Sequence, residues 1–184
     1  MFIDEVTILI QAGDGGDGCR SFRREKYVPL GGPDGGDGGD GGDIIFEADS
    51  HLSTLTDLKN SRLYKAGCGS PGKGKTMTGK EGKDLVIKIP AGTLIKDGES
   101  LGLLADLTEH KARFVAASGG RGGRGNARFK SSINRAPRRF DLGVKTEEKK
   151  LFLELKLLAD VAVIGLPNAG KSTFISKISH ARPK

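Results

Sequence analysis

Apolar and polar residues alternate along the first part of the chain with the period of a strand that has one buried face. Residues 2–10 place Val6, Ile8 and Ile10 on the same side. The same signal predicts further short strands, each bounded by turn residues, at 44–47, 85–89, 93–95, 101–107 and 112–116. Because no helical pattern separates these strands, we expect a mainly β fold, either a β-sandwich or a small β-barrel. Residues 51–65 suit a helical turn or a strand equally well.

The pattern changes near the end of the sequence, where it becomes that of an α/β domain. Residues 145–150 are charged and are expected to turn, and residues 151–156 are predicted to form a strand. Residues 160–164 form a β-branched apolar run that is typical of a buried parallel strand, and a helical face follows from Lys171. We therefore expect two domains, 1–158 and 159–184, the second being a truncated α/β domain of one strand, one loop and one helix.

A glycine-rich run repeats Gly-Gly-Asp through residues 35–43, so that aspartates recur at every third position from 34 to 43. Three residues per turn is the period of a polyproline II helix, in which these carboxylates would lie on one face, about 9 Å apart. The glycines would let neighbouring segments approach closely. Three interpretations are open: ordered and packed polyproline II segments, a disordered arm, or a calcium site.

Charge is distributed unevenly along the chain. The net charge is +7, but residues 1–43 hold nine acidic and four basic side chains, whereas residues 44–184 hold fourteen acidic and twenty-six basic ones. This asymmetry suggests a polyanionic partner for the basic part, although a soluble domain that is merely basic has the same composition.

Other features exclude several protein classes. Cys19 and Cys68 are too few for a disulfide framework or a zinc site, so we expect reduced thiols. Asp4 and Glu5 precede the first apolar stretch, unlike a secretory signal, and no run reaches the roughly 18 apolar residues of a membrane span. We expect a soluble, cytoplasmic protein. The histidines are isolated from other ligand-type residues and are expected to be structural: His51, His110 and His180.

Residues 165–172 match G-x-x-x-x-G-K-[ST], the loop that wraps nucleotide phosphates. Gly165 and Gly170 permit turns that direct backbone N–H groups at phosphate oxygens, and the following helix adds the positive end of its dipole. Lys171 would reach the β- and γ-phosphates, and the Ser172 hydroxyl would ligate Mg²⁺. The pattern by itself does not separate ATP from GTP.

Basic side chains are concentrated between Lys111 and Arg139, where there are nine bases and no acid. Arginines set among glycines suit close phosphate contacts, and Phe129 suits stacking on a base. The alternative is structural, because arginines can also bond the carbonyls of polyproline segments, which lack internal partners. The candidate RNA-binding residues are Arg121, Arg124, Arg128, Phe129, Lys130, Arg135, Arg138 and Arg139.

Several motifs, taken together and in this order, resemble the Obg family of bacterial and organellar GTPases. They are Glu-Lys-Tyr-Val-Pro at 25–29, Ile-Pro-Ala-Gly-Thr at 89–93, Gly-Gly-Arg-Gly-Gly-Arg-Gly-Asn-Ala-Arg-Phe at 119–129, Leu-Glu-Leu-Lys-Leu-Leu-Ala-Asp-Val at 153–161 and Gly-Leu-Pro-Asn-Ala-Gly-Lys-Ser-Thr at 165–173. The last motif also resembles the phosphate loop of translation-factor-like GTPases. The resemblance covers essentially the whole chain.

The resemblance implies the Obg fold, a glycine-rich polyproline II bundle set on a small β-barrel, followed by the start of a P-loop GTPase domain. It implies a GTP-hydrolysing factor of large ribosomal subunit assembly, whose glycine-rich tip contacts ribosomal RNA. Ser172 would hold Mg²⁺, and Asn168 matches an asparagine that helps bind K⁺ in related potassium-stimulated GTPases. The residues that bind GTP or GDP would be Gly165, Leu166, Pro167, Asn168, Ala169, Gly170, Lys171, Ser172 and Thr173.

The residues that switch, catalyse and recognise guanine are expected beyond Lys184. We therefore expect this chain to be a monomer that binds the large ribosomal subunit and its RNA but lacks GTPase activity of its own. The alternative is a stand-alone module for ribosome and RNA binding, with a nonfunctional nucleotide-binding stub.

Overall fold

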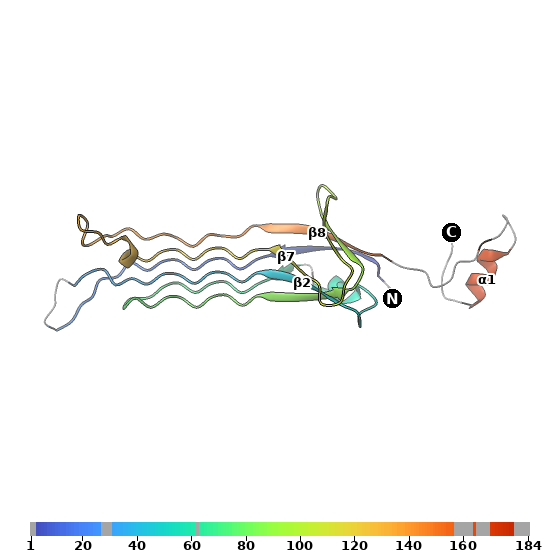
Figure 1. Cartoon of the computed structure of the whole chain (residues 1–184), viewed down its shortest axis with the longest axis horizontal. Helices are drawn as coiled ribbons and strands as arrows, with labels where there is room; N and C mark the ends of the chain where they lie inside the picture. Colours follow the sequence, from blue (N-terminus) through green and yellow to red (C-terminus); the bar gives the residue numbers. More distant parts are fainter. Residues whose placement is uncertain (1–2, 27–30, 62, 157–163, 165–169, 179–184) are drawn as a thin grey trace.

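The computed structural model describes residues 3–26, 31–61, 63–156, 164 and 170–178. Figure 1 shows an elongated domain in which long glycine-rich segments run side by side away from a compact β region. Strands at the compact end continue into these segments, and the chain then returns along another segment to the next strand. It therefore passes repeatedly along the length of the domain.

Two β-sheets form the compact end. One has the strand order β3-β1-β8-β5-β6 and the other β4-β2-β7. In the first sheet, β1 pairs antiparallel with β8 over its whole length, from Glu5 opposite Glu154 to Gln11 opposite Glu148. The strands are β1 Glu5–Gln11, β2 Ile44–Asp49, β3 Leu63–Lys65, β4 Leu85–Pro90, β5 Thr93–Asp97, β6 Leu103–Leu107, β7 Arg113–Ala117 and β8 Glu148–Leu155.

The alternation seen in the sequence places apolar side chains between the two sheets. Ile8 and Ile10 of β1 are 1% and 0% exposed, and Ile44 and Phe46 of β2 are both 0% exposed. These residues belong to one buried cluster, which also contains Leu153 of β8. The predicted mainly β fold is confirmed for this end of the domain, and of the two predicted alternatives, sandwich or small barrel, the two separate sheets favour the sandwich.

One prediction of local structure needs correction, and the structure assigns one segment that the sequence left open. The turn expected at residues 145–150 is too long, because β8 begins at Glu148 and Lys149 lies opposite Ile10 of β1. The charged side chains of residues 148–150 are all exposed although consecutive strand residues alternate between the two faces, and exposed charge alone does not distinguish such a strand end from a turn. The unassigned residues 51–65 form the 3₁₀ helix η1 (Thr56–Asn60) and the short strand β3.

Extended segments without helix or strand assignment make up the bundle, and their hydrogen bonds recur at every third residue. The N–H groups of Gly13, Gly16 and Cys19 donate at 2.9, 2.8 and 2.9 Å to carbonyls of the neighbouring segment, those of Gly42, Gly39 and Gly36. A period of three is that of polyproline II helices, and the prediction of ordered, packed segments is confirmed. The segments are 12–21, 33–43, 66–73, 77–84, 118–125 and 137–147.

The aspartates that recur every third residue bond the backbone of neighbouring segments. Asp37, Asp40 and Asp43 accept hydrogen bonds from backbone N–H groups at 2.8, 2.6 and 2.7 Å, and the donors are Gly125, Gly122 and Gly119. The aspartate repeat therefore joins segment 33–43 to segment 118–125 by one hydrogen bond in each turn. No group of three or more potential ligands that could hold a metal ion occurs within the described ranges, so the structure offers no support for a calcium site.

Much of the predicted α/β part lies outside the described residues, namely 157–163 and 165–169, and with it the expected domain boundary near residue 158. The helix α1 spans Lys171–Ile178 and begins where the sequence predicts. In the part of the chain that the structure describes, no helix is long and apolar enough to cross a membrane.

Candidate nucleic-acid interface

The phosphate loop is described only at its end. Gly165, Leu166, Pro167, Asn168 and Ala169 lie outside the described residues. Gly170 has a φ of 80°, a backbone conformation that favours glycine, and its carbonyl accepts the N–H of Phe174 at 2.9 Å to open α1. Lys171 therefore occupies the first position of the helix, with Ser172 and Thr173 next, which fits the order that a phosphate loop requires.

Asn126 anchors the far end of the bundle, and sequence reasoning did not select it. Its side chain is 0% exposed. The side-chain oxygen accepts the N–H of Gly35 at 2.9 Å, and the amide nitrogen donates to the carbonyls of Ser21 and Pro137 at 2.9 and 3.2 Å. One buried amide thus joins three segments at the first residue of the 3₁₀ helix η2 (Asn126–Phe129), which carries part of the basic cluster.

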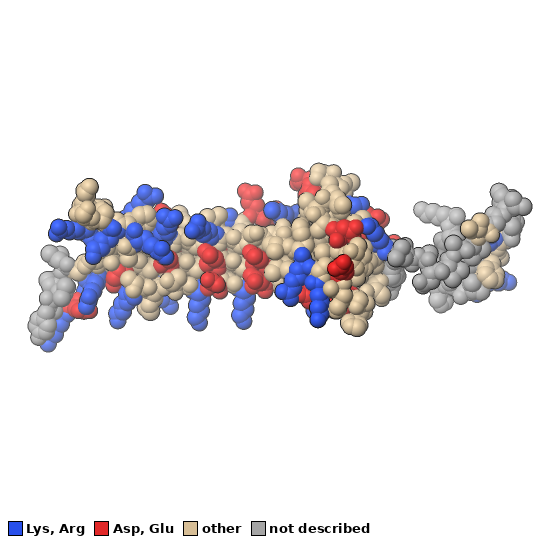
Figure 2. Space-filling model, in the orientation of Figure 1, with Lys and Arg blue, Asp and Glu red and all other residues tan. Residues whose placement is uncertain are grey.

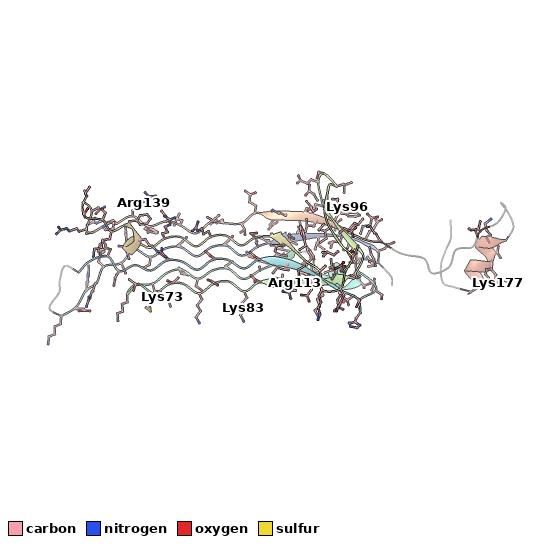
Figure 3. The ribbon with its side chains drawn as sticks, in the orientation of Figure 1. Lys73, Lys83, Lys96, Arg113, Arg139 and Lys177 are labelled. Carbon is pink, nitrogen blue, oxygen red and sulfur yellow. The ribbon has the colours of Figure 1, made fainter. Side chains whose placement is uncertain are left out.

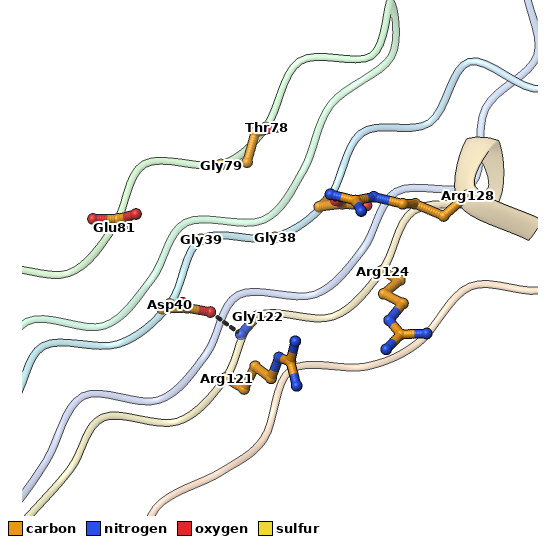
Figure 4. A pocket seen from close by; sticks show the side chains of 11 residues that line it. Gly38, Gly39, Asp40, Thr78, Gly79, Glu81, Arg121, Gly122, Arg124 and Arg128 are labelled. Carbon is orange, nitrogen blue, oxygen red and sulfur yellow. Dashed lines mark hydrogen bonds and ion pairs between the residues drawn. The ribbon is translucent and has the colours of Figure 1, made fainter.

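Arg121 and Arg124 line one wall of a groove of about 340 Å³ along the flank of the bundle (Figure 4). Glycine backbone and the carboxylates of Asp37 and Asp40 lie between the walls, and Thr78 and Glu81 line the opposite wall. Both arginines are exposed, and within the described ranges neither guanidinium makes an ion pair or a hydrogen bond. Their backbone carbonyls are already bonded by N–H groups of segment 137–147. The alternative role, in which arginine side chains bond the carbonyls of polyproline segments, is therefore not observed for Arg121 and Arg124.

Arg128, Phe129 and Arg139 are engaged within the protein. The Arg128 guanidinium lies 2.7 Å from a carboxylate oxygen of Asp37, so this arginine does tie two segments together. The Arg139 guanidinium stacks over the Phe129 ring, 5.0 Å from its centroid. The prediction of base stacking on Phe129 is therefore restricted, because Arg139 covers one face of the ring while its guanidinium also lies 3.5 Å from a carboxylate oxygen of Asp141.

The remaining candidates lie at the tip of the bundle. Lys130, Arg135 and Arg138 are exposed in and beside the loop that follows η2. Figure 2 shows Lys and Arg side chains gathered at this end, far from the sheets. Four further tip cations were missed because they are distant in sequence from the basic cluster: Arg20, Arg23, Arg24 and Lys75.

Those additional cations belong to two structural features. Arg20 lies over the Phe140 ring at 6.0 Å, a second arginine–aromatic pair. Arg23, Arg24, Lys75 and Lys130 line a cavity of about 680 Å³ at the tip. Within it, a two-bond contact with Arg23 lowers the pKa of Glu25, so this carboxylate is held ionised. The only sequence signal for this cavity was the Arg-Arg-Glu-Lys stretch at 23–26.

Residues 3–157 match the family model described as GTP1/OBG. The chain belongs to this family. A protein named GTPase Obg from Thermodesulfovibrio yellowstonii is 60% identical to the chain over 183 residues, which cover all of the chain and 54% of that relative. GTPase Obg from Sulfurihydrogenibium sp. is 58% identical, with 53% of its length covered, and that from Magnetococcus marinus is 56% identical, with 47% covered.

The GTP1/OBG match covers only part of the chain. The family match spans the sandwich, the bundle and every candidate in the basic cluster, whereas the phosphate loop follows it. The alignments with the Obg relatives extend over the loop as well. The chain spans about half the length of these relatives.

Proposed function

We propose that this chain is part of a GTP-hydrolysing factor of large ribosomal subunit assembly, and that its glycine-rich bundle binds ribosomal RNA. The observation that carries the proposal is the pair Arg121 and Arg124, exposed and without ion-pair partners in the described ranges, on a backbone locked by glycine contacts. The names of the relatives supply the GTPase part of the proposal.

The shape and charge of the tip suit RNA. Guanidinium groups form two-pronged bonds to phosphates, and the glycines of the groove let a sugar-phosphate backbone approach closely, beside the aspartates Asp37 and Asp40, which are bonded to backbone N–H groups. The Arg139–Phe129 pair offers a flat face on which an unpaired base can stack. Because the scaffold is rigid, little side-chain freedom beyond that of the arginines themselves is lost on binding.

The nucleotide part of the proposal rests on the loop. The left-handed Gly170 and the helix starting at Lys171 fit a cradle for phosphate oxygens, with Ser172 as the Mg²⁺ ligand. We propose Asn168 as a K⁺ ligand and assign guanine recognition and switching to the part of the protein outside this sequence. GTP would then favour docking on the pre-large subunit, and hydrolysis would release the protein.

RNA binding is tested with an Arg121→Ala/Arg124→Ala variant, using purified large ribosomal subunits at several salt concentrations. Loss of two charge-assisted contacts should weaken binding at least about tenfold. It should also reduce the slope of log K against log salt by about 1 to 2. A Lys59→Ala/Lys149→Ala variant removes the same charge from the sheet end and serves as control. Equal binding by the two folded variants would refute the proposal.

Nucleotide binding is tested by calorimetry with GTP and Mg²⁺. We expect no measurable binding by the 184-residue chain. In the full-length protein we expect binding that a Lys171→Ala substitution abolishes. Micromolar binding by the 184-residue chain would overturn the assignment of guanine recognition to the rest of the protein, and its absence from the full-length protein would overturn the GTPase proposal.

A further inference from the structure

A second basic surface runs along an edge of the bundle, on residues outside the basic cluster. Lys80 and Lys83 are three residues apart in segment 77–84, one turn of a polyproline II helix. Lys73, on the adjacent segment, donates its N–H to the carbonyl of Met77 at 2.9 Å, which places it one further turn along. Figure 3 shows Lys73 and Lys83 along the same edge of the bundle. We call Lys73, Lys80 and Lys83 the lysine row.

The three-residue period separates opposite charges that are adjacent in the sequence Lys-Glu-Gly-Lys-Asp at 80–84. Gly79 and Gly82 donate their N–H groups inward to segment 33–43. Glu81 lines the arginine groove, on a different side from the row. The lysines take the remaining side, which faces away from the bundle. In a strand or an α-helix, this order of residues would mix the two charges on the same faces.

The lysine row is exposed and has no carboxylate partner within the described ranges. Several other exposed cations of the domain are paired, among them Arg113 with Glu47, Lys156 with Asp106 and Arg128 with Asp37, whereas the lysine row shares with Arg121 and Arg124 the lack of a carboxylate partner in the described ranges. The backbone beneath the row is fixed by bonds from Gly67 to Lys83 and from Ser70 to Lys80, at 2.9 and 2.8 Å. The ammonium groups are therefore carried at regular intervals of about 9 Å along a rigid edge.

We propose that the lysine row is a phosphate-backbone contact that fixes how the bundle is rotated against the RNA held at its tip. The inference rests on the proposed RNA binding. A protein partner is disfavoured because protein interfaces are built around apolar anchors. Met77, 51% exposed, is the one large exposed apolar side chain in the described part of residues 66–84. Lysines act on phosphates as point charges, which position a nucleic acid without reading its sequence.

The row and the arginine groove border the same segment, 77–84, from two sides. Thr78 and Glu81 line the groove, and Lys80 and Lys83 carry the row. An RNA whose unpaired bases meet the tip can therefore extend its backbone along this segment. Contacts at the tip alone would leave an elongated domain free to rotate about its long axis, and a row parallel to that axis removes this freedom.

The test uses a Lys73→Gln/Lys80→Gln/Lys83→Gln variant of the 184-residue chain and isolated large ribosomal subunits. The matched control, Lys59→Gln/Lys111→Gln/Lys149→Gln, removes the same charge from exposed positions at the sheet end. We expect the row variant alone to bind more weakly and its salt slope to fall by about 2, since each phosphate contact with a single strand contributes about 0.7. Both variants should keep the melting temperature of the parent chain, because the substituted side chains carry no internal contacts.

The outcomes separate this inference from the proposed function. If the arginine variant loses binding but the row variant matches its control, the row makes no contact and the inference fails while RNA binding stands. If the parent chain does not bind the subunits, the proposed function fails first. The measurement is repeated on ribosomal RNA freed of protein. A loss seen on subunits but absent on this RNA would identify a protein partner and overturn the inference.

Discussion

A single methyl group at Gly13 is predicted to break the bundle. An alanine Cβ there would lie 1.8 Å from the carbonyl oxygen of Gly67 and 2.7 Å from the nitrogen of Gly42. Those two atoms are the acceptor and donor of one backbone hydrogen bond, 2.8 Å long. The added carbon would therefore clash with both the donor and the acceptor of this bond, and one segment would have to move by more than an ångström to make room for it.

Two contributions make up the free-energy cost of this displacement. Losing the bond leaves a buried N–H of Gly42 without a partner, which costs about 1–3 kcal/mol. Overpacking a rigid interior costs about 1–3 kcal/mol more. We therefore expect Gly13→Ala to destabilise the chain by about 2–6 kcal/mol, a large share of the roughly 5–15 kcal/mol of a typical domain. For a chain of this size, the melting temperature should fall by about 10 °C.

Gly32→Ala is the matched control, because no heavy atom lies within 4 Å of the Cβ it would add. Its φ is not positive, so alanine fits the backbone and should stabilise the chain by about 0.4–1 kcal/mol, through a less flexible unfolded state. The assay is thermal unfolding followed by calorimetry and circular dichroism. If the two variants melt at the same temperature, close glycine contacts do not hold the bundle together and the reasoning is refuted.

Two further predictions concern polar contacts of the bundle. Asn126→Ala leaves the buried N–H of Gly35 unbonded and should cost about 2–4 kcal/mol, with faster hydrogen exchange at the tip than in the sheets as the measurement that localises the damage. The N–H and then the hydroxyl of Thr146 lower the pKa of Asp14 below the ordinary aspartate value of 3.8. The stability this gives is present above that pH and is lost as the pH falls through the folded-state pKa, so Thr146→Val, which keeps only the N–H, should flatten the acid limb of a stability–pH curve.

The period of the aspartates favoured polyproline II segments, because that helix has three residues per turn, although it left a disordered arm and a calcium site as alternatives. Which segments lie together was not predictable. Gly16, for example, bonds Gly39 of one segment and Gly123 of another. Any glycine-rich segment with the same three-residue period could make these hydrogen bonds equally well. The pairing is set by the sandwich, since each segment continues a strand whose place in a sheet depends on distant residues.

The candidate site was predictable in part for the same reason. The arginines at 121 and 124 stand out because they interrupt a glycine run, and the groove confirms that they lie side by side. Asn126 gave no such signal, since an asparagine after glycine is equally typical of a turn. The stacking of Arg139 on Phe129 joins residues ten apart across an irregular loop, where no periodicity guides a prediction.

The bundle also explains the acidic start of a basic protein. The first 43 residues carry nine acids, yet Asp14, Asp17 and Asp37 each accept a backbone N–H from a facing segment. These bonds hold the carboxylates against the bundle. The cations of the lysine row and the arginine groove point outward on long side chains. A polyanion meeting the flank or the tip therefore encounters more positive charge than the composition suggests. The three-residue period that packs the glycines thus also places these aspartates at contacts between segments and the lysine row on the proposed RNA-binding surface.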